Sequence, residues 1–311
     1  MEPTKRATSQ PLQSSPLRAR LCGDRAAQSG LTPPALHSVF DPRLIVLRGV
    51  SGAPVKLESA YPLAEALRSA IMVASPQQPP PDWISGHAPD GRPLDCPHLA
   101  LLSLADVGHS RATGQLLGMA LAIPAAVDPG QLAVLRALLF ERTPGALRRV
   151  TLRTRGIKWE LELCERAERG SALDGEIWTG GTRGATVWAT VSPIVFDKHP
   201  KQKRVADAPP PARAQAEAEY WEQVERMIGK ACERVGLPRP AKVTATPESA
   251  CAGAPAAGQV PRLARKNGSL RRQTHAVLRF DTPVAGPILL GAGRYRGYGA
   301  CRPLNIGSER E

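Results

Sequence analysis

The residue types best suited to binding an anion that carries bases gather near the C-terminus, at residues 291–299, which read GAGRYRGYG. Glycine leaves the backbone bare, so that a partner can approach its N–H groups closely. Arginine adds guanidinium groups for phosphate, and tyrosine adds flat rings on which a base can stack. The same pattern also fits a glycine-rich turn that binds nothing. We expect a nucleic-acid-binding loop made of Gly291, Gly293, Arg294, Tyr295, Arg296, Gly297 and Tyr298.

A second basic segment precedes this loop. Residues 247–272 have little apolar pattern and are expected to form a mobile basic loop. The whole chain carries a formal net charge of +13 and has a pI near 10.0, an excess that points to nucleic acid or another anionic surface. Further phosphate contacts are therefore expected from Arg262, Arg265, Lys266, Arg271, Arg272 and, in the strand that follows, His275.

Proton transfer would fall to histidine, because the sequence has no serine nucleophile elbow, Walker loop or kinase motif. None of the six histidines stands at a metal-binding spacing, so we expect no metal and no cofactor. His87 and His109 each follow a glycine in a polar loop, where an imidazole that titrates near neutrality can meet a substrate. A turn or a structural hydrogen bond is the alternative role for each, and His98, at the start of a strand, is expected to be structural.

Length and composition limit the number of domains and the cellular compartment of the protein. With 311 residues, the chain is long enough for two modest domains. The six cysteines are scattered without a C-x-x-C pair, which is typical of a reducing cytoplasm. No apolar run is long enough to span a membrane, and the basic N-terminus lacks the apolar core of a secretory signal. We expect a cytoplasmic protein with no membrane partner.

Hydrophobic periodicity predicts an α+β protein. The first half has the β-α-β-β-α-β order of a ferredoxin-like unit. Its expected elements are strand 44–47, helix 61–73, a loop over 74–97, strands 98–104 and 116–123, a helix from Asp128-Pro129 to about residue 140, and strand 148–154.

The second half is predicted to be a degenerate ferredoxin-like unit that ends in the glycine-rich loop. Its expected elements are strand 157–163 paired with 148–154, strand 186–191, helix 213–235, strands 242–246 and 273–280, and a short buried strand 288–290. The predicted organisation is a disordered segment 1–39, a first domain 40–155, a second domain 156–304 and a tail 305–311.

Several motifs together resemble one family. They include SGHAPDGRP at 85–93, WATVSP at 188–193, DKHPK at 197–201 and the closing stretch 286–304. With these motifs, residues 40–304 resemble the repeat-RNA-processing region of the type I-U (I-G) CRISPR-associated fusion family, in which a Cas-five-type backbone subunit precedes a Cas-six-type endoribonuclease. The resemblance implies tandem ferredoxin-like (RRM-like, RAMP-type) domains and a glycine-rich loop that grips RNA.

The resemblance also implies metal-independent cleavage of CRISPR repeat RNA. His87 would act on the 2′-hydroxyl or the 5′-oxygen, His109 is a second catalytic candidate, and Lys198 or Arg294 would stabilise charge on the phosphate. The product would carry a 2′,3′-cyclic phosphate and a 5′-hydroxyl. Expected partners are repeat RNA, crRNA and the other subunits of a type I-U (I-G) effector complex.

Two features depart from the family's pattern. Residues 1–39 show no pattern of the family's N-terminal backbone domain, so we expect that domain to be absent from this chain. Arg111 stands where relatives are expected to have a histidine, two residues after His109. Two alternatives therefore stay open, a crRNA-binding subunit that does not cut and a basic scaffold protein without RNA specificity.

Overall fold

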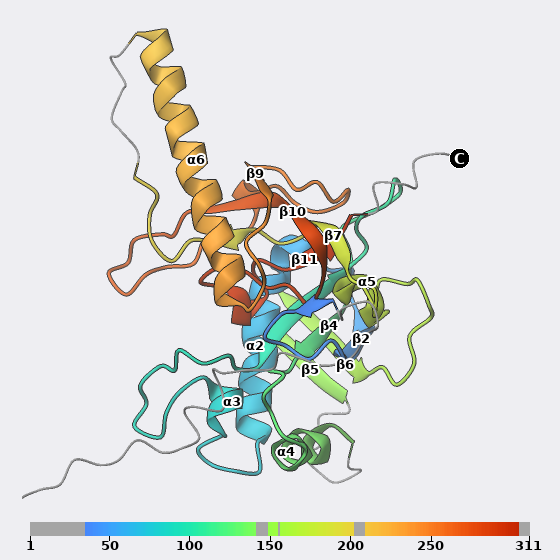
Figure 1. Cartoon of the computed structure of the whole chain (residues 1–311). Coiled ribbons are helices and arrows are strands. Elements are labelled where there is room, and N and C mark those ends of the chain that lie inside the picture. The colour runs from blue at the N-terminus through green and yellow to red at the C-terminus, as the bar shows by residue number, and fades with distance from the viewer. Residues whose placement is uncertain (1–34, 141–148, 155, 202–208, 305–311) are drawn as a thin grey trace, which may run out of the picture. The chain divides into compact units, whose positions relative to one another are not determined.

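Two β-sheets organise the described chain, one from its first half and one mainly from its second half (Figure 1). The computed structural model describes residues 35–140, 149–154, 156–201 and 209–304, all within one unit of the chain, residues 34–311. Its mixture of helices and mostly antiparallel strands confirms the expected α+β class. No helix in these described ranges is both long enough and apolar enough to cross a membrane.

The first sheet contains the predicted β-α-β-β-α-β elements and one strand more. They are β2 (Ile45–Gly52), α2 (Ala60–Ala74), β3 (Ala100–Ala105), β4 (Leu116–Ala122), α4 (Pro129–Phe140), β5 (Arg149–Thr154) and β6 (Ile157–Leu163). The strand order is β3-β4-β2-β6-β5, so β6 and not β5 lies beside β2. The predicted domain boundary between residues 155 and 156 is wrong, because it divides the paired strands β5 and β6 of one sheet.

Helix α2 packs on this sheet because its apolar side chains share one stripe. Leu63, Leu67 and Ile71 recur every four residues, and each is at most 1% exposed. The helix contacts β3 and β5. Strand β3 is buried along its whole length and also contacts the short helix η3 (Arg294–Arg296) from the glycine-rich stretch. The first sheet and α2 therefore form the support on which that stretch lies.

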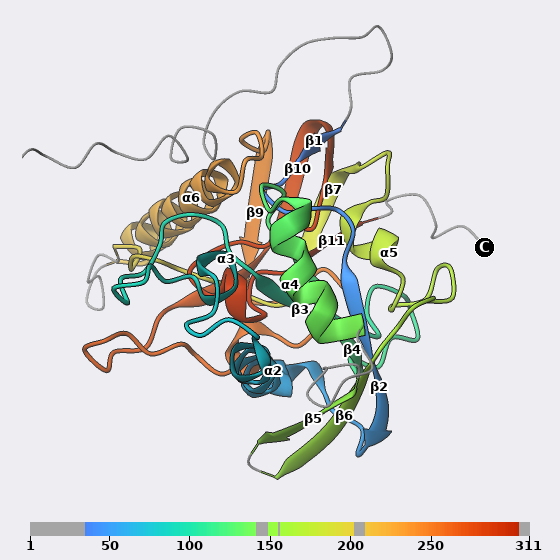
Figure 2. The ribbon, with the colours of Figure 1, turned by 90° about the horizontal axis from the view of Figure 1, so that it is seen from below.

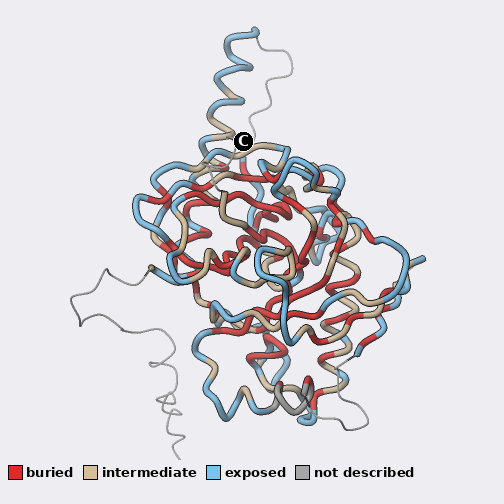
Figure 3. The backbone as a smooth tube through the Cα atoms, turned by 90° about the vertical axis from the view of Figure 1, so that its right-hand side faces the viewer, coloured by how far each residue is buried: buried red, intermediate tan, exposed pale blue. Residues whose placement is uncertain are grey.

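The second sheet is built around the long strand β10 (Figure 2). Its other elements are β7 (Ala185–Thr190), β8 (Ile194–Val195), α6 (Pro210–Arg234), β9 (Lys242–Thr246), β10 itself (Gln273–Ala285) and β11 (Cys301–Pro303). With β1 (Leu36–His37) at one edge, the order is β1-β10-β7-β11, and both β8 and β9 also pair with β10. Helix α6 packs on β9 through its C-terminal half, whereas its first turns are exposed (Figure 3).

The segment before β2 corrects one expectation. Residues 1–34 and 305–311 lie outside the described residues, and the predicted disorder and tail fall there. Strand β1 (Leu36–His37), however, pairs in parallel with β10, and Ser38 Oγ donates a 2.7 Å hydrogen bond to the Pro287 carbonyl. The predicted disordered segment 1–39 therefore extends too far, because its last residues add a strand to the second sheet.

Other segments differ from their predicted form. Residues 288–290 are buried but lie outside the named strands, and Leu289 makes an isolated bridge to Ala300. Residues 247–272, expected to be a mobile loop, contain η2 (Ala257–Gln259) and the buried side chains of Cys251 and Leu263. Their apolar residues are spaced too widely to give a periodic pattern in the sequence, but single side chains are buried in the structure. Further short helices are η1 (Leu57–Ser59), α3 (Asp82–Ser85) and α5 (Gly175–Thr179).

The buried core spans both halves of the described chain. Trp178, Ala189 and Leu289 of the second half belong to the same apolar cluster as α2 and the first sheet. A separate cluster lies under α6, where Val224 and Ile228 pack with β10. Because the first cluster is shared, the glycine-rich stretch is held in place by residues from both halves.

Gly299 tests how tightly that stretch is packed. Its φ is +66°, and a Cβ at this position would collide with the Leu290 carbonyl oxygen. We expect Gly299→Ala to lower the free energy of unfolding by about 2–4 kcal/mol, from backbone strain and from the clash. Chemical denaturation measures the loss, with Gly258→Ala as control, since a Cβ there meets nothing within 4 Å. Equal stability of the two variants would contradict the packing.

Candidate functional site

The glycine-rich loop, residues 291–299, is held against the rest of the protein. Its helix η3 packs on β3 and α2. A Cβ at Gly293 would lie 2.7 Å from the Tyr298 side chain, and one at Gly291 would collide with a backbone carbonyl of β8. Gly291, Gly293 and Gly297 are all buried. These glycines therefore let the loop pack on the protein itself, which corrects the expectation that their bare backbone faces a ligand.

Tyr298 belongs to this packing. Its side chain is 1% exposed, and its hydroxyl donates a 2.5 Å hydrogen bond to the Pro261 carbonyl. Its ring centroid lies 5.2 Å from that of Tyr61, at the start of α2. Burial raises the pKa of the Tyr298 hydroxyl. The predicted contact of Tyr298 with a base is therefore wrong, because this side chain ties the loop to its surroundings.

Tyr295 stacks on a histidine from the first half. The ring centroids of Tyr295 and His98 are 3.5 Å apart, with 26° between the ring planes. The guanidinium carbon of Arg294 lies 4.5 Å from the same tyrosine centroid, a cation–π contact. We call His98, Tyr295 and Arg294 the aromatic stack. It joins the glycine-rich loop to the segment that leads into β3.

His98 is the neutral member of the aromatic stack. Burial lowers the pKa of His98 to about 4, and the charges of Arg68, Arg294 and His87 act in the same direction. Its Nδ1–H donates to the Cys96 carbonyl at 3.3 Å, because a carbonyl can only accept. Its Nε2 edge faces Gly86, where a Cβ would lie 2.7 Å from Nε2. A side chain at position 86 would therefore push His98 out of the stack.

Within the described part of the chain, His87 forms a hydrogen bond through only one of its two ring nitrogens, Nδ1. Its side chain is exposed, and its Nδ1–H donates to the Ser85 carbonyl at 2.9 Å. The same carbonyl accepts a hydrogen bond from Nη2 of Arg68, on α2. A neutral imidazole with its proton on Nδ1 keeps an unshared electron pair on Nε2, which is the form that a general base needs. Arg68 and Ser85 therefore orient His87 for proton transfer.

Three arginines and one glutamate lie around this histidine loop. Nε of Arg296 is 3.5 Å from Oε1 of Glu65, an ion pair between partly exposed side chains. Burial and the charge of Arg296 lower the pKa of the Arg68 guanidinium. Arg294 adds a third guanidinium, so the positive charge of the three arginines outweighs the negative charge of Glu65. A bound phosphate would relieve the repulsion among the guanidinium groups. We call the following residues the glycine-loop site: Glu65, Arg68, His87, His98, Arg294, Tyr295 and Arg296.

A second basic surface lies next to the glycine-rich loop. We call it the basic hairpin, meaning residues 261–272 together with Lys198 and His199. Arg271 Nη1 donates to the carbonyls of Phe196 and Asp197, which precede Lys198. The structure thus brings Lys198 together with the hairpin arginines. The expected nucleic-acid contacts in it are Arg262, Arg265, Lys266, Arg271 and Arg272, of which Arg262 and Lys266 are exposed.

His109 belongs to a different part of the surface. Hydrogen bonds from Thr113 and His109 lower the pKa of Asp106 to about 2, and His109 Nε2 lies 2.6 Å from its Oδ1. This loop follows the end of β3, whereas His98 and the His87 loop lie before its start. The six residues of β3 extend over about 20 Å. His87 and His109, both expected to be catalytic, therefore cannot act on one phosphate.

His275 is buried and cannot reach a phosphate. It is 1% exposed, with Nε2 3.0 Å from the Pro255 carbonyl oxygen and Nδ1 2.9 Å from Thr190 Oγ1. Burial lowers the pKa of His275 to about 4. The predicted phosphate contact is therefore wrong, because this histidine holds β10 to β7 and to residue 255.

Sequence reasoning missed the role of Arg68 and the partner of His98. Arg68 stands four residues after Ala64, at the edge of the buried stripe of α2, and a cation at such a position was the available signal. His98 is structural, as expected, but it stacks on a residue from the other half of the chain. No local pattern connects the two, so the sequence could not indicate this contact.

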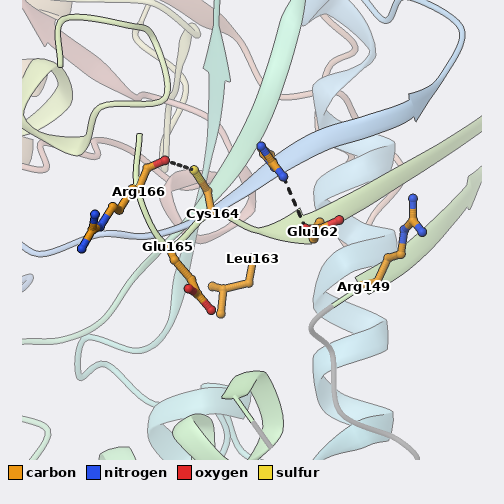
Figure 4. Close-up of a pocket in the computed structure, with 7 residues that line it drawn as sticks. Arg149, Glu162, Leu163, Cys164, Glu165 and Arg166 are labelled. Carbon is orange, nitrogen blue, oxygen red and sulfur yellow. Dashed lines mark hydrogen bonds and ion pairs between the residues drawn. The ribbon is translucent and has the colours of Figure 1, made fainter. Parts of the chain in front are cut away.

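A cavity of about 450 Å³ lies elsewhere, along β2, β5 and β6 (Figure 4). It is lined by charged side chains that include Arg48, Arg149 and Glu162, and Arg48 pairs with Glu162 at 3.4 Å. The lining residues belong neither to the glycine-loop site nor to the basic hairpin. The cavity therefore plays no part in the chemistry considered below.

Most of the chain matches a known protein family. The family model described as CRISPR-associated protein, GSU0054 family, matches residues 55–303. No protein of curated function matches the sequence. A solved structure described as CRISPR associated protein Cas6 is 11% identical, with 84% of this chain and 98% of that chain covered and a TM-score of 0.39.

Half-buried His98 and buried His275 predict how stability depends on pH. The pKa values of His98 and His275 are lowered to about 4 from an ordinary value of 6.5. The unfolded chain therefore binds more protons between these values, and the free energy of unfolding falls as the pH falls from 6.5 towards 4. We expect each histidine to account for a loss of about 2 kcal/mol between pH 7 and pH 5.

Urea unfolding of the wild type and of His98→Gln across this pH range measures the effect. The variant should lose the share of the pH dependence that belongs to His98 and keep that of His275. An identical pH dependence in the two proteins would show that burial in the aromatic stack does not hold His98 neutral.

Proposed function

The chain belongs to the CRISPR-associated GSU0054 family, and from this premise we propose that it is an endoribonuclease that cuts CRISPR repeat RNA without a metal and retains the crRNA. One observation carries the proposal. The Ser85 carbonyl accepts hydrogen bonds from both His87 and Arg68, and Nε2 of His87, beside a surplus of guanidinium groups, has no hydrogen-bond partner among the residues that the structure describes. A free base next to phosphate-binding cations is what attack by a 2′-hydroxyl requires.

In the proposed reaction, His87 Nε2 takes the proton of a ribose 2′-hydroxyl. The 2′-oxygen attacks the neighbouring phosphorus, the bond between phosphorus and the 5′-oxygen breaks, and water protonates the leaving oxygen. One product ends in a 2′,3′-cyclic phosphate and the other begins with a 5′-hydroxyl. His87 then returns its proton to solvent, to which its side chain is exposed.

The charge that develops on the phosphate would be stabilised by Arg68, Arg294 and Arg296. The aromatic stack holds Arg294 close to the His87 loop, so that cation and base approach the phosphate together. Lys198 lies with the basic hairpin, and we assign it to RNA binding. His109 has no catalytic part in this proposal, because β3 separates it from His87.

We also propose that the two sheets are tandem ferredoxin-like units of the RAMP type. In a β-α-β-β-α-β unit the first strand lies between the third and the fourth. The order β3-β4-β2-β6 supports this arrangement in the first half, with β6 in the fourth place. In the second half, β9-β10-β7-β11 has the same order, with α6 between β7 and β9. The glycine-rich loop then occupies the place of the second helix.

RNA would lie across the glycine-loop site and the basic hairpin, which adjoin each other where Tyr298 bonds to Pro261. Retention of the crRNA would rest on phosphate contacts of both surfaces. The other subunits of a type I-U (I-G) effector complex are the proposed protein partners, and this subtype rests on the sequence motifs.

A crRNA-binding subunit that does not cut is the second candidate. The basic hairpin favours it, because its arginines can bind RNA without any proton transfer. Incubation of the purified protein with its cognate repeat RNA and EDTA decides between the two. Cleavage supports the nuclease, whereas intact RNA, even with partner subunits present, supports the binding subunit.

Replacement of His87 tests its catalytic role. We expect His87→Ala to slow single-turnover cleavage by about 10²–10⁴-fold, the usual cost of losing a general base. RNA affinity should change little, because a neutral imidazole adds little to a phosphate-dominated interface. The matched control is His109→Ala, another exposed histidine beside a glycine, which should cut at the wild-type rate. If His109→Ala cut slowly while His87→Ala cut at the wild-type rate, the catalytic role would belong to His109 and not to His87.

Replacement of Arg294 and Arg296 tests whether the glycine-rich loop touches RNA. The logarithm of the binding constant should fall with the logarithm of salt concentration by roughly 0.7 for each phosphate neutralised on a single strand. We expect the double variant to alanine to bind more weakly and to have a flatter slope. Arg149→Ala with Arg153→Ala, on β5, removes the same charge elsewhere and is the control. Equal slopes in both double variants would exclude the loop from the interface.

A further inference from the structure

Two arginines of the basic hairpin are fixed by backbone oxygens of residues 196–197. Arg271 Nη1 lies 3.1 Å from the Phe196 carbonyl oxygen and 2.9 Å from that of Asp197. Arg265 Nη2 reaches the Asp197 oxygen at 3.4 Å. Neutral carbonyls orient these guanidinium groups but leave their charge in place. Two positioned cations therefore lie against the segment that precedes His199.

Helix α6 positions a third. Arg272 Nη1 lies 3.3 Å from the Tyr220 hydroxyl, and its guanidinium carbon is 5.6 Å from the centre of the Tyr220 ring. Trp221 meets Tyr220 edge-on, with 5.4 Å between ring centroids. Both aromatic side chains are partly exposed, so they add surface that suits an unpaired base. The third cation is thus accompanied by aromatic rings.

Asp197, the carboxylate that precedes Lys198 in the chain, is already engaged in an ion pair. Oδ2 of Asp197 pairs with Nη1 of Arg234, on α6, at 2.7 Å. The positive charge of the three hairpin arginines and of Lys198 is therefore not balanced by Asp197 alone. A bound anion would relieve this repulsion, as it would in the glycine-loop site.

His199 follows Lys198 within this cluster. Desolvation and the charges of Arg265, Arg272 and Arg271 lower the pKa of His199. Among the described residues, the charged groups that face it are thus the three hairpin arginines, with Lys198 beside it and with the pair of Asp197 and Arg234 adjoining. A phosphate would reverse the local field and favour the protonated imidazole.

We propose that Arg265, Arg271, Arg272 and His199 form a subsite for one phosphodiester of single-stranded RNA, and that His199 takes up a proton when the phosphate binds. The inference rests on the proposed RNA-binding function and extends it to a second set of residues, away from His87. RNA held here becomes more tightly bound as the pH falls, because the added proton completes the cationic cluster.

Fluorescence anisotropy with a single-stranded oligouridylate tests the subsite without any need for cleavage. The wild type should bind at least about threefold tighter at pH 5.5 than at pH 7.5. His199→Gln should lose this gain. His109→Gln, an exposed histidine beyond the far end of β3, is the matched control and should retain it.

The arginines are tested by the double variant Arg265→Gln with Arg272→Gln. It should weaken binding at both pH values and reduce the salt slope by roughly 0.7 for each phosphate that the variant no longer neutralises. The proposal is overturned by an unchanged pH gain in His199→Gln, by unchanged affinity of the arginine variant, or by a wild type that does not bind the oligouridylate at low salt. If the wild type shows the pH gain but never cuts its repeat RNA, the subsite stands and the nuclease proposal fails.

Discussion

The glycine-loop site depends on the contact between His98 and Tyr295, whose rings stack 3.5 Å apart. One ring comes from the segment before β3 and the other from the glycine-rich loop, so this contact joins the two halves at the site. It requires a glycine at position 86, where any side chain would strike the imidazole. It also requires a neutral His98, because an imidazolium there would repel Arg68 and Arg294. Packing and charge therefore impose one arrangement on the proposed base and its cations.

The glycine-rich loop also matters for the proposed second ferredoxin-like unit, in which it would replace a helix. In the proposed second ferredoxin-like unit, residues 291–299 occupy the place of a helix between β10 and β11. A helix would bury its backbone and one apolar face, whereas this loop buries its glycines and leaves Arg296 exposed. On this proposal, a packed loop that carries cations over α2 takes the place of a packing helix. Beside it, the basic hairpin extends the positive surface, so that a polyanion could contact both.

Much of the fold could be predicted because its helices and strands are strongly periodic, and α2 and β6 lie within a residue of their expected bounds. The domain boundary was placed wrongly although the predicted pairing of 157–163 with 148–154 already crossed it, and the pairing of β6 with β2 shows that both strands belong to the first sheet. The site was predicted in part. His87 stands out as a histidine after glycine, and Arg294 and Arg296 as cations among glycines. The burial of Tyr298 and His275 and the separation of His109 from His87 are tertiary facts, which residue types alone do not contain.

The proposed reaction requires one stretch of RNA to contact both His87 and the arginines of the glycine-rich loop. This contact can be tested by photocrosslinking of cognate repeat RNA that carries 4-thiouridine at successive positions, followed by mass spectrometry of the bound peptides. We predict that one nucleotide position crosslinks both to a peptide containing residues 85–98 and to a peptide containing residues 294–296. Crosslinks confined to residues 106–114 or to strands β5 and β6, with neither of those two peptides labelled, would show that RNA does not bind at the glycine-loop site.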